Sequence, residues 1–178
     1  MANEDLKDTI GDLYFFSLSR VIEAIYYDED LSDVLYFIVN LAAELTGGMG
    51  STLRVLGKDF DLRLVASHGL SKSYLEAGAV DYGKSILEIQ EGDILFIKDV
   101  EKDPRVQNKL AAQKEGIRSV IGIPSTVDEN TYCVMRVYFS DPKVPYQDEV
   151  DFLIALLRLA CIAIHRAASL ELANSSNA

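Results

Sequence analysis

The spacing of hydrophobic residues predicts helices at both ends of the chain. Between residues 3 and 27, apolar or small side chains recur every three or four positions, as one face of an amphipathic helix requires. These positions are Leu6, Ile10, Leu13, Ser17, Val21 and Ala24. A second helix is predicted over residues 33–45, with Ser32 as its N-cap and Gly47 at its end. A long final helix is predicted over residues 147–172.

Between these helices the pattern changes to the alternation that is typical of strands. The predicted strands lie at residues 51–57, 62–69, 93–97, 119–124 and 131–139. The first two are separated by a short turn and form a hairpin, and so do the last two. Short helices are predicted at residues 71–77 and from Asp103-Pro104 to about residue 114. This order predicts an α+β fold with a mainly antiparallel sheet, covered on one face by the terminal helices.

The strand at residues 131–139 has two faces of different chemistry. One face carries Tyr132, Val134, Arg136 and Tyr138, and the other carries Cys133, Met135, Val137 and Phe139. We expect the wholly apolar face to meet the long helices. The Tyr/Arg face would then line a small-molecule cavity, with Thr52 and Arg54 as neighbours. Core packing with partly exposed ends is the alternative for this face.

Composition and charge narrow the function classes. The chain has 178 residues, of which 49% are hydrophobic, a share inconsistent with disorder, and the length suggests one domain plus an extra helix. The net charge of −11 argues against a nucleic-acid or anionic-membrane surface. Residues 1–33 carry −7 of this charge, so the remainder is nearly balanced. No uninterrupted run of 18 apolar residues and no basic leader occur, so we expect a cytoplasmic protein.

Catalytic motifs are weak in this sequence. Cys133 and Cys161 each lie in an apolar run and are expected to be reduced, packed thiols, and no metal site is indicated. Residues 78–85 match the phosphate-loop pattern G-x-x-x-x-G-K-S, but the strand before it and the helix after it are missing, so we interpret it as a chance match. We therefore expect no enzyme. The less favoured alternative is a small thiol-dependent redox enzyme acting through Cys133.

Two arginines stand near the expected edge of the sheet. Arg105 follows Asp103-Pro104, and Arg118 immediately precedes the strand at residues 119–124. Each guanidinium could hold an anionic ligand, or could pair with Asp99 or Asp103 and close the loop. We favour the structural pairing.

Several segments, taken in order and spacing, resemble the GAF domain family. They are VASHGL, GKSI, ILFIKDVEKDPR, EGIRSVIGIP, YCVMRVYFSDP and DEVDFLIALLRLACIAI. The most specific are EGIRS, which leads into a strand ending at Pro124, and the stretch from Asp99 to Arg105. The resemblance implies a PAS-related, six-stranded sheet with the long helices on one face and short helices and loops over a pocket on the other. The domain would span residues 31–168, after a helical extension at 1–30 and before a helix end and polar tail at 169–178.

The resemblance also implies a function, that of a regulatory, small-molecule-sensing domain of a signalling protein without catalysis of its own. The candidate ligand-binding residues are Arg54, Tyr82, Ser85, Asp99, Arg118, Ser119, Arg136 and Tyr138. The ligand stays unidentified. Cyclic-nucleotide-binding members have a Phe where this chain has Val144. Bilin-binding members need a Cys near a His in the pocket region, and neither Cys133 nor Cys161 has a His beside it.

The terminal helices are expected to extend past the sheet with narrow apolar stripes. We therefore predict a homodimer with these helices in its interface, and a fused or separate signalling output domain. A pure dimerisation or interaction module that binds no ligand is the main alternative.

Overall fold

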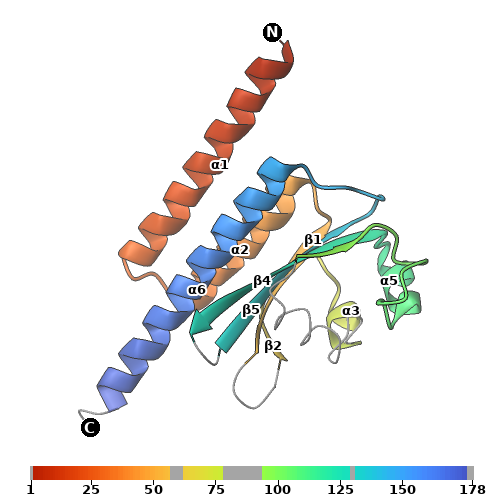
Figure 1. Cartoon of the computed structure of the whole chain (residues 1–178). Coiled ribbons are helices and arrows are strands. Elements are labelled where there is room, and N and C mark those ends of the chain that lie inside the picture. Colours follow the sequence, from red (N-terminus) through yellow and green to blue (C-terminus); the bar gives the residue numbers. More distant parts are fainter. Residues whose placement is uncertain (1, 57–61, 78–93, 129–130, 176–178) are drawn as a thin grey trace.

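An antiparallel sheet organises the chain in the computed structural model, which describes residues 2–56, 62–77, 94–128 and 131–175 (Figure 1). Its strands are β1 (Gly50–Leu56), β2 (Leu62–His68), β3 (Leu95–Ile97), β4 (Ser119–Asp128) and β5 (Thr131–Phe139). They lie in the order β2-β1-β5-β4-β3, and each neighbouring pair is antiparallel. Both predicted hairpins are confirmed. Five strands are present among the described residues, so the sixth strand that the resemblance implied is not confirmed.

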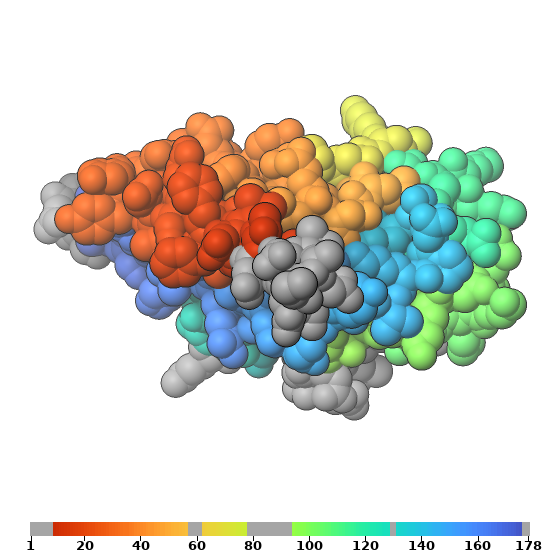
Figure 2. Space-filling view, turned by 90° about the horizontal axis from the view of Figure 1, so that it is seen from above, coloured from red at the N-terminus to blue at the C-terminus, as the bar shows by residue number. Residues whose placement is uncertain are grey.

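Three helices cover one face of this sheet in two layers (Figure 1). The helices α2 (Leu31–Thr46) and α6 (Gln147–Ser175) pack directly on the strands, and α1 (Ala2–Tyr26) packs on those two helices. Figure 2, which is viewed from above, shows α1 at the surface beside α2 and α6. The short helices α3 (Lys72–Glu76) and α5 (Lys109–Glu115) pack against the opposite face of the sheet.

The main hydrophobic core lies between the sheet and α2 and α6. Strand β5 contributes Cys133, Met135, Val137 and Phe139, as the alternation predicted. Facing them are residues of both helices, among them Ile38, Val39, Ala42, Leu153, Leu156 and Leu157. Burying each large aliphatic side chain contributes roughly 1.5–3 kcal/mol, so this layer supplies most of the stability.

The start of α2 differs from the prediction. Asp30, rather than Ser32, is the N-cap, and its carboxylate accepts a hydrogen bond of 2.8 Å from the Ser32 backbone N–H. Asp and Ser are about equally good caps, so their order in Asp-Leu-Ser does not decide between them. The predicted end is confirmed, since Gly47 closes the helix with φ of +68°.

The prediction that a helix begins at Asp103-Pro104 is wrong. Helix α5 begins at Lys109, and the Asn108 side chain caps it by accepting a 3.0 Å hydrogen bond from the Ala111 N–H. Upstream, the Asp103 carboxylate accepts the Arg105 N–H at 2.9 Å. An Asp side chain that binds the backbone two residues later stabilises a turn in place of a helix.

Helix α6 bears on the expectation, drawn from the lack of a long apolar run, that no segment spans a membrane. Among the described residues it is the one helix long and apolar enough, by length and composition, to cross a membrane. Charged residues such as Arg158 interrupt its apolar run, so the sequence contains no continuous stretch of 18 apolar residues. The signal is weak because core helices of soluble proteins share these properties, and α6 buries Phe152, Leu153 and Leu156 against the rest of the domain.

The close approach of two chain segments at Gly69 yields a stability prediction. Gly69 has φ of +72°, and a Cβ atom there would overlap the Met49 carbonyl oxygen. We expect Gly69→Ala to lower the free energy of unfolding by roughly 2 kcal/mol or more, since backbone must move.

Gly116→Ala is the matched control, because Gly116 has φ of +83° but open space around its Cα. It should cost about 1 kcal/mol through conformation alone. Urea denaturation measures both variants, and equal losses would contradict the role of the close approach.

Candidate functional site

A cluster of arginine, tyrosine and threonine side chains lies on the sheet face opposite the long helices. We call it the arginine–tyrosine face, and it comprises Thr52, Arg54, Tyr74, Arg136 and Tyr138. All but Arg54 are buried, and the Arg136 side chain is only 2% exposed. A nearly fully buried guanidinium is uncommon in proteins, so this face is more than ordinary core.

The register of three neighbouring strands builds this face. Thr52 of β1 lies directly opposite Arg136 of β5, and on the other side Arg136 lies opposite Gly122 of β4. A Cβ atom on Gly122 would lie 3.3 Å from the Leu95 Cβ and 3.6 Å from the Arg136 Cγ. The absence of a side chain at Gly122 therefore leaves room chiefly for Leu95, because 3.6 Å from the Arg136 Cγ is an ordinary van der Waals contact.

Tyr138 connects the two strands and the short helix above them. Its hydroxyl lies 3.3 Å from the Thr52 Oγ1, within hydrogen-bonding distance. Its ring meets the ring of Tyr74 edge to face, with centroids 5.7 Å apart and planes at 85°. This arrangement is a favourable one for aromatic pairs and fixes the orientation of Tyr74.

Helix α3 positions Tyr74 in the arginine–tyrosine face. The Ser71 hydroxyl caps this helix by accepting a 3.2 Å hydrogen bond from the Tyr74 N–H. The Glu115 carboxylate at the end of α5 in turn accepts hydrogen bonds from the Ser71 N–H at 2.6 Å and from the Ser71 hydroxyl at 2.5 Å. The two short helices are thereby tied together, and Tyr74 is held over the sheet.

Electrostatics keep the Tyr74 hydroxyl protonated. Burial raises the pKa of Tyr74 far above its ordinary value. Tyr138 and the Glu115 carboxylate add to the increase, while Arg136 and Arg54 act in the opposite direction. This hydroxyl is buried and has no hydrogen-bond partner among the described residues. A buried O–H donor close to two guanidinium groups is suited to a ligand that carries acceptor oxygens and negative charge.

The structure brings three of the predicted site residues together: Arg54, Arg136 and Tyr138. Tyr82 and Ser85 lie outside the described residues. Thr52 was expected only as a neighbour.

Sequence reasoning missed Tyr74. The one available signal was Ser71 as a cap, which predicts a helix there but not where that helix packs.

The other three predicted residues lie elsewhere. Ser119 is buried on the helix side of β4, where its hydroxyl donates to the Asp141 carbonyl at 2.7 Å and accepts from the Lys143 N–H at 3.1 Å. The Arg118 side chain is exposed. The Asp99 carboxylate accepts a 2.8 Å hydrogen bond from the Lys102 ammonium, which lowers the pKa of Asp99. Ser119 and Asp99 therefore hold neighbouring loops, whereas the Arg118 side chain is exposed.

The expected pairing of Arg105 is confirmed. Its guanidinium meets the Asp103 carboxylate at 2.7 Å and 3.0 Å, and also donates to the Phe96 carbonyl at 2.8 Å. The pKa of Asp103 is lowered chiefly by this hydrogen bond. The pair anchors the chain after β3 and stands away from the arginine–tyrosine face.

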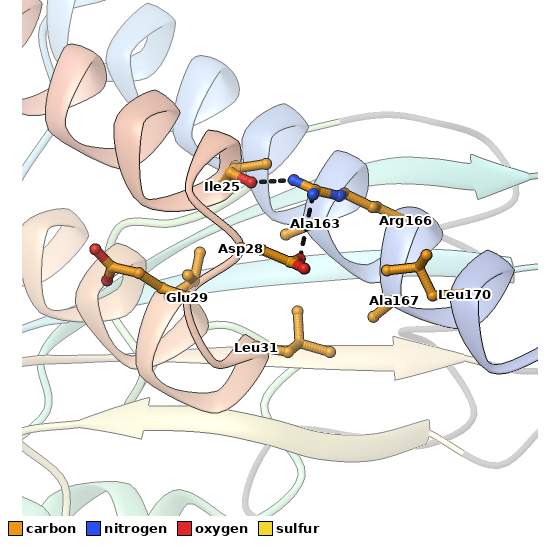
Figure 3. Close-up of a pocket in the computed structure, with 9 residues that line it drawn as sticks. Ile25, Asp28, Glu29, Leu31, Ala163, Arg166, Ala167 and Leu170 are labelled. Atoms are coloured by element: carbon orange, nitrogen blue, oxygen red, sulfur yellow. Dashed lines mark hydrogen bonds and ion pairs between the residues drawn. The ribbon is translucent and has the colours of Figure 1, made fainter. Parts of the chain in front are cut away.

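A small hollow lies where the turn between α1 and α2 meets α6 (Figure 3). The Arg166 guanidinium donates to the Ile25 carbonyl at the end of α1 and pairs with the Asp28 carboxylate at 3.2 Å. With a volume of about 120 Å³, the hollow is too small for most metabolites. It is a junction that connects α6 to the end of α1.

Catalytic chemistry is not evident in the described parts of the chain. No group of three or more His, Cys, Asp or Glu side chains there could hold a metal ion. The arginine–tyrosine face carries donors and positive charge, an arrangement for binding.

Comparisons with known proteins point to one family. The sequence model of the GAF domain matches residues 30–164. No curated protein matches the chain.

Solved structures similar to this chain include GAF domains of phosphoenolpyruvate-protein phosphotransferases. The domain from Coxiella burnetii has a TM-score of 0.71 at 16% identity, over 88% of this chain and 96% of that one. The domain from Acinetobacter has a TM-score of 0.68 at 21% identity, over 88% and 95%. A phycocyanobilin-bound GAF domain of a cyanobacterial phytochrome has a TM-score of 0.66 at 13% identity, over 86% and 94%. At such identities the likeness shows the fold alone.

The two tyrosines give a matched pair of variants. Tyr138→Phe removes a hydroxyl that lies within reach of Thr52, so it should lower the free energy of unfolding by about 1 kcal/mol. Tyr74→Phe removes a buried hydroxyl without a described partner, so the ligand-free protein should be equally stable or slightly more stable. Chemical denaturation measures both, and a loss of more than about 1 kcal/mol in Tyr74→Phe would show that its hydroxyl is already satisfied.

Proposed function

The chain belongs to the GAF domain family, and we propose that it is the sensory domain of a signalling protein which binds a small anionic molecule on the arginine–tyrosine face. GAF domains are sensory and regulatory domains, and they are generally not catalytic. Similar structures include bilin-bound GAF domains, so this fold accommodates small molecules. The ligand is proposed to be anionic on the basis of this chain's own residues.

The observation that carries the proposal is the pairing of buried positive charge with a donor hydroxyl. Arg136 is 2% exposed, Arg54 lies on the same face, and the Tyr74 hydroxyl lies close enough for both to affect its pKa. Carboxylate or phosphate oxygens are the acceptors that a guanidinium binds most strongly, with geometric selectivity. The acidic N-terminal helix does not oppose this, because α1 packs on α2 and α6, on the helix side of the sheet (Figure 1).

Strand β5 offers a route from ligand to helices. Arg136 and Tyr138 face the proposed ligand, while Met135 and Val137, which alternate with them along the strand, pack in the core with α2 and α6. A ligand that binds one packing of β5 more tightly would shift the population of helix arrangements. The Arg166 junction would carry a shift of α6 to the end of α1.

The helix α1 presents an apolar stripe for a second copy of the chain. Phe15, Ile22 and Tyr26 are spaced by seven and four residues, so they lie on one face of the helix, and they are between 53% and 75% exposed. This spacing is that of a coiled-coil seam. Large exposed apolar side chains in one row mark an interaction surface. We therefore propose a homodimer through the terminal helices.

The proposal also includes the domain bounds, the cellular location and an output domain. We place the sensory domain at residues 31–168, in a cytoplasmic protein with a fused or separate output domain. A pure dimerisation module is the second candidate, because the stripe on α1 supports it without any ligand. The thiol enzyme acting through Cys133 is disfavoured, since Cys133 is fully buried and its pKa is raised by its hydrogen bond to Cys161 and by burial.

Ligand binding is tested by thermal shift with a panel of phosphorylated and carboxylated metabolites. At least one should raise the melting temperature increasingly with its concentration, with about 2.7 kcal/mol gained at a hundredfold excess over Kd. Arg136→Met should lose this shift, because the guanidinium is removed while the apolar stem is kept.

Arg118→Met serves as the control, since Arg118 is exposed at the sheet edge, and it should respond like the natural protein. A shift that survives in Arg136→Met would refute the assigned site. No shift with any anion would favour the ligand-free module.

The homodimer is tested by light scattering coupled to size exclusion. The natural chain should give twice the 19.7 kDa of one subunit, and the double variant Phe15→Ser, Ile22→Ser should give the monomer mass. Leu110→Ser is the control, because Leu110 is 71% exposed on the distant helix α5. Monomer mass for the natural chain at concentrations well above micromolar would rule out the dimer.

A further inference from the structure

The arginine–tyrosine face is closed to solvent over most of its area. Thr52, Arg136 and Tyr138 are each at most 2% exposed, and Tyr74 is 5% exposed. A ligand that binds these side chains therefore has to enter while a covering element is displaced. Local openings of this kind use the parts of a domain that are held least strongly.

Helix α3 is the element best suited to such a movement among the described parts of the chain. It has five residues, too few to be stable as a helix without tertiary contacts. Its Tyr74 ring lies edge to face against the Tyr138 ring, so a displacement of α3 uncovers Tyr138. Thr52 lies next to it, with its hydroxyl 3.3 Å from the Tyr138 hydroxyl.

The chain immediately before α3 is fixed to the sheet. Gly69 packs so closely on Met49 that a Cβ atom on Gly69 would overlap the Met49 carbonyl oxygen. Leu70 lies equally close to Gly50, since a Cβ atom on Gly50 would lie 2.8 Å from the Leu70 Cγ. A movement of α3 therefore begins after Leu70, at Ser71.

One carboxylate of α5 holds the chain at Ser71. Glu115 accepts the Ser71 N–H at 2.6 Å with one oxygen and the Ser71 hydroxyl at 2.5 Å with the other. The same hydroxyl accepts the Tyr74 N–H at 3.2 Å, so the bond to α5 and the cap of α3 share one side chain. Hydrogen bonds to a carboxylate are about twice as strong as those between neutral groups. Helix α5 is itself anchored by Ala112, which is buried in the core beneath it, as is Ile117 just beyond its end.

We propose that α3 is the gate of the arginine–tyrosine face and that the Glu115 carboxylate is the latch which keeps it closed. When Ser71 leaves Glu115, α3 moves away from the sheet with Tyr74, and Tyr138 and Thr52 become accessible. Glu115 is a positioning residue, because it acts through Ser71 and Tyr74. The role of the gate rests on the proposed function, whereas the opening itself requires no ligand.

A thiol placed under the gate measures the opening. Thr52→Cys puts a thiol where the hydroxyl beside Tyr138 lies. Dithionitrobenzoate, an aromatic disulfide that carries carboxylates, exchanges with an accessible thiol and releases a coloured thiolate. Glu115→Ala in this background removes both acceptor oxygens and should raise the labelling rate about tenfold, as expected for loss of hydrogen bonds to a charged group. An unchanged rate would overturn the proposal.

Two controls separate the gate from a general loosening of the fold. Glu76→Ala removes a carboxylate from α3 itself, where Glu76 forms an exposed pair with Lys72 at 3.5 Å, and it should leave the labelling rate unchanged. Cys133 and Cys161 are buried on the helix side of the sheet and report global opening, so Glu115→Ala should not accelerate their labelling. Equal acceleration of the introduced thiol and these two would contradict the gate.

Hydrogen exchange tests the same movement in a chain that keeps Thr52. The amides of Leu75 and Ala77 in α3 donate to the Ser71 and Ser73 carbonyls. In Glu115→Ala they should exchange about tenfold faster, whereas the amides of β5 should keep their natural rates. Natural rates in α3 would refute the latch even if Thr52→Cys fails to fold.

Because neither measurement contains a ligand, the gate and the proposed function can fail separately. Faster labelling in Glu115→Ala, with no thermal shift for any anion, would support the opening of α3 and refute the binding of anions. Unchanged labelling, with a thermal shift that Arg136→Met abolishes, would refute the gate and leave the binding site in place.

Discussion

The central strand β5 has to fit two buried environments at once, and the rest of the structure depends on how its residues divide between them. From Cys133 to Phe139 every residue of β5 is buried. Odd-numbered residues pack against α2 and α6, and Arg136 and Tyr138 lie under α3 and α5. A shift of register by one residue would place a guanidinium in the apolar core, so the pairing of β5 with β1 and β4 is strongly specified.

This division separates two kinds of chemistry on one strand. The face under the short helices holds Arg136 and Tyr138 beside Thr52 and Tyr74, a set of donors and positive charge suited to an anion. The face under the long helices holds Cys133, Met135, Val137 and Phe139, which pack in the hydrophobic core with α2 and α6. Both faces belong to the same strand, so a ligand on the arginine–tyrosine face would influence the long helices through β5.

Contacts within the helical layer connect α6 to α1. The ring of Tyr14 in α1 stacks on the ring of Phe152 in α6, with centroids 4.2 Å apart and planes at 10°. At the C-terminal end of α1, Arg166 of α6 reaches the Ile25 carbonyl and Asp28 (Figure 3). A movement of α6 would therefore reach α1 at two points.

Much of this architecture could be predicted from the sequence because its signals are periodic. Alternation located both hairpins and both faces of β5, and the three-to-four-residue spacing located the long helices. Two helix starts were predicted wrongly because neighbouring residues can play competing local roles. Asp30 and Ser32 are about equally good caps for α2. The Asp103 side chain stabilises a turn where Asp103-Pro104 suggested the start of a helix.

The site was only partly predictable for a different reason. Strand register places Arg54, Arg136 and Tyr138, and register follows from the hydrophobic pattern. Tyr74 reaches the site through the packing of α3 on α5, which depends on the Ser71–Glu115 hydrogen bonds between residues 44 positions apart. Such contacts leave no periodic trace in a sequence. Ser119 was misplaced for the related reason that a strand end shows no sign of which loop it will hold.

Mass spectrometry of the natively purified protein tests the central claim most directly. If the arginine–tyrosine face binds a small anion, the non-denatured subunit should be heavier than its sequence mass of 19.7 kDa by one small acidic molecule. This added mass should disappear on denaturation and be missing from folded Arg136→Met. A bare sequence mass for the folded natural protein, unchanged when anionic metabolites are added, would contradict the account.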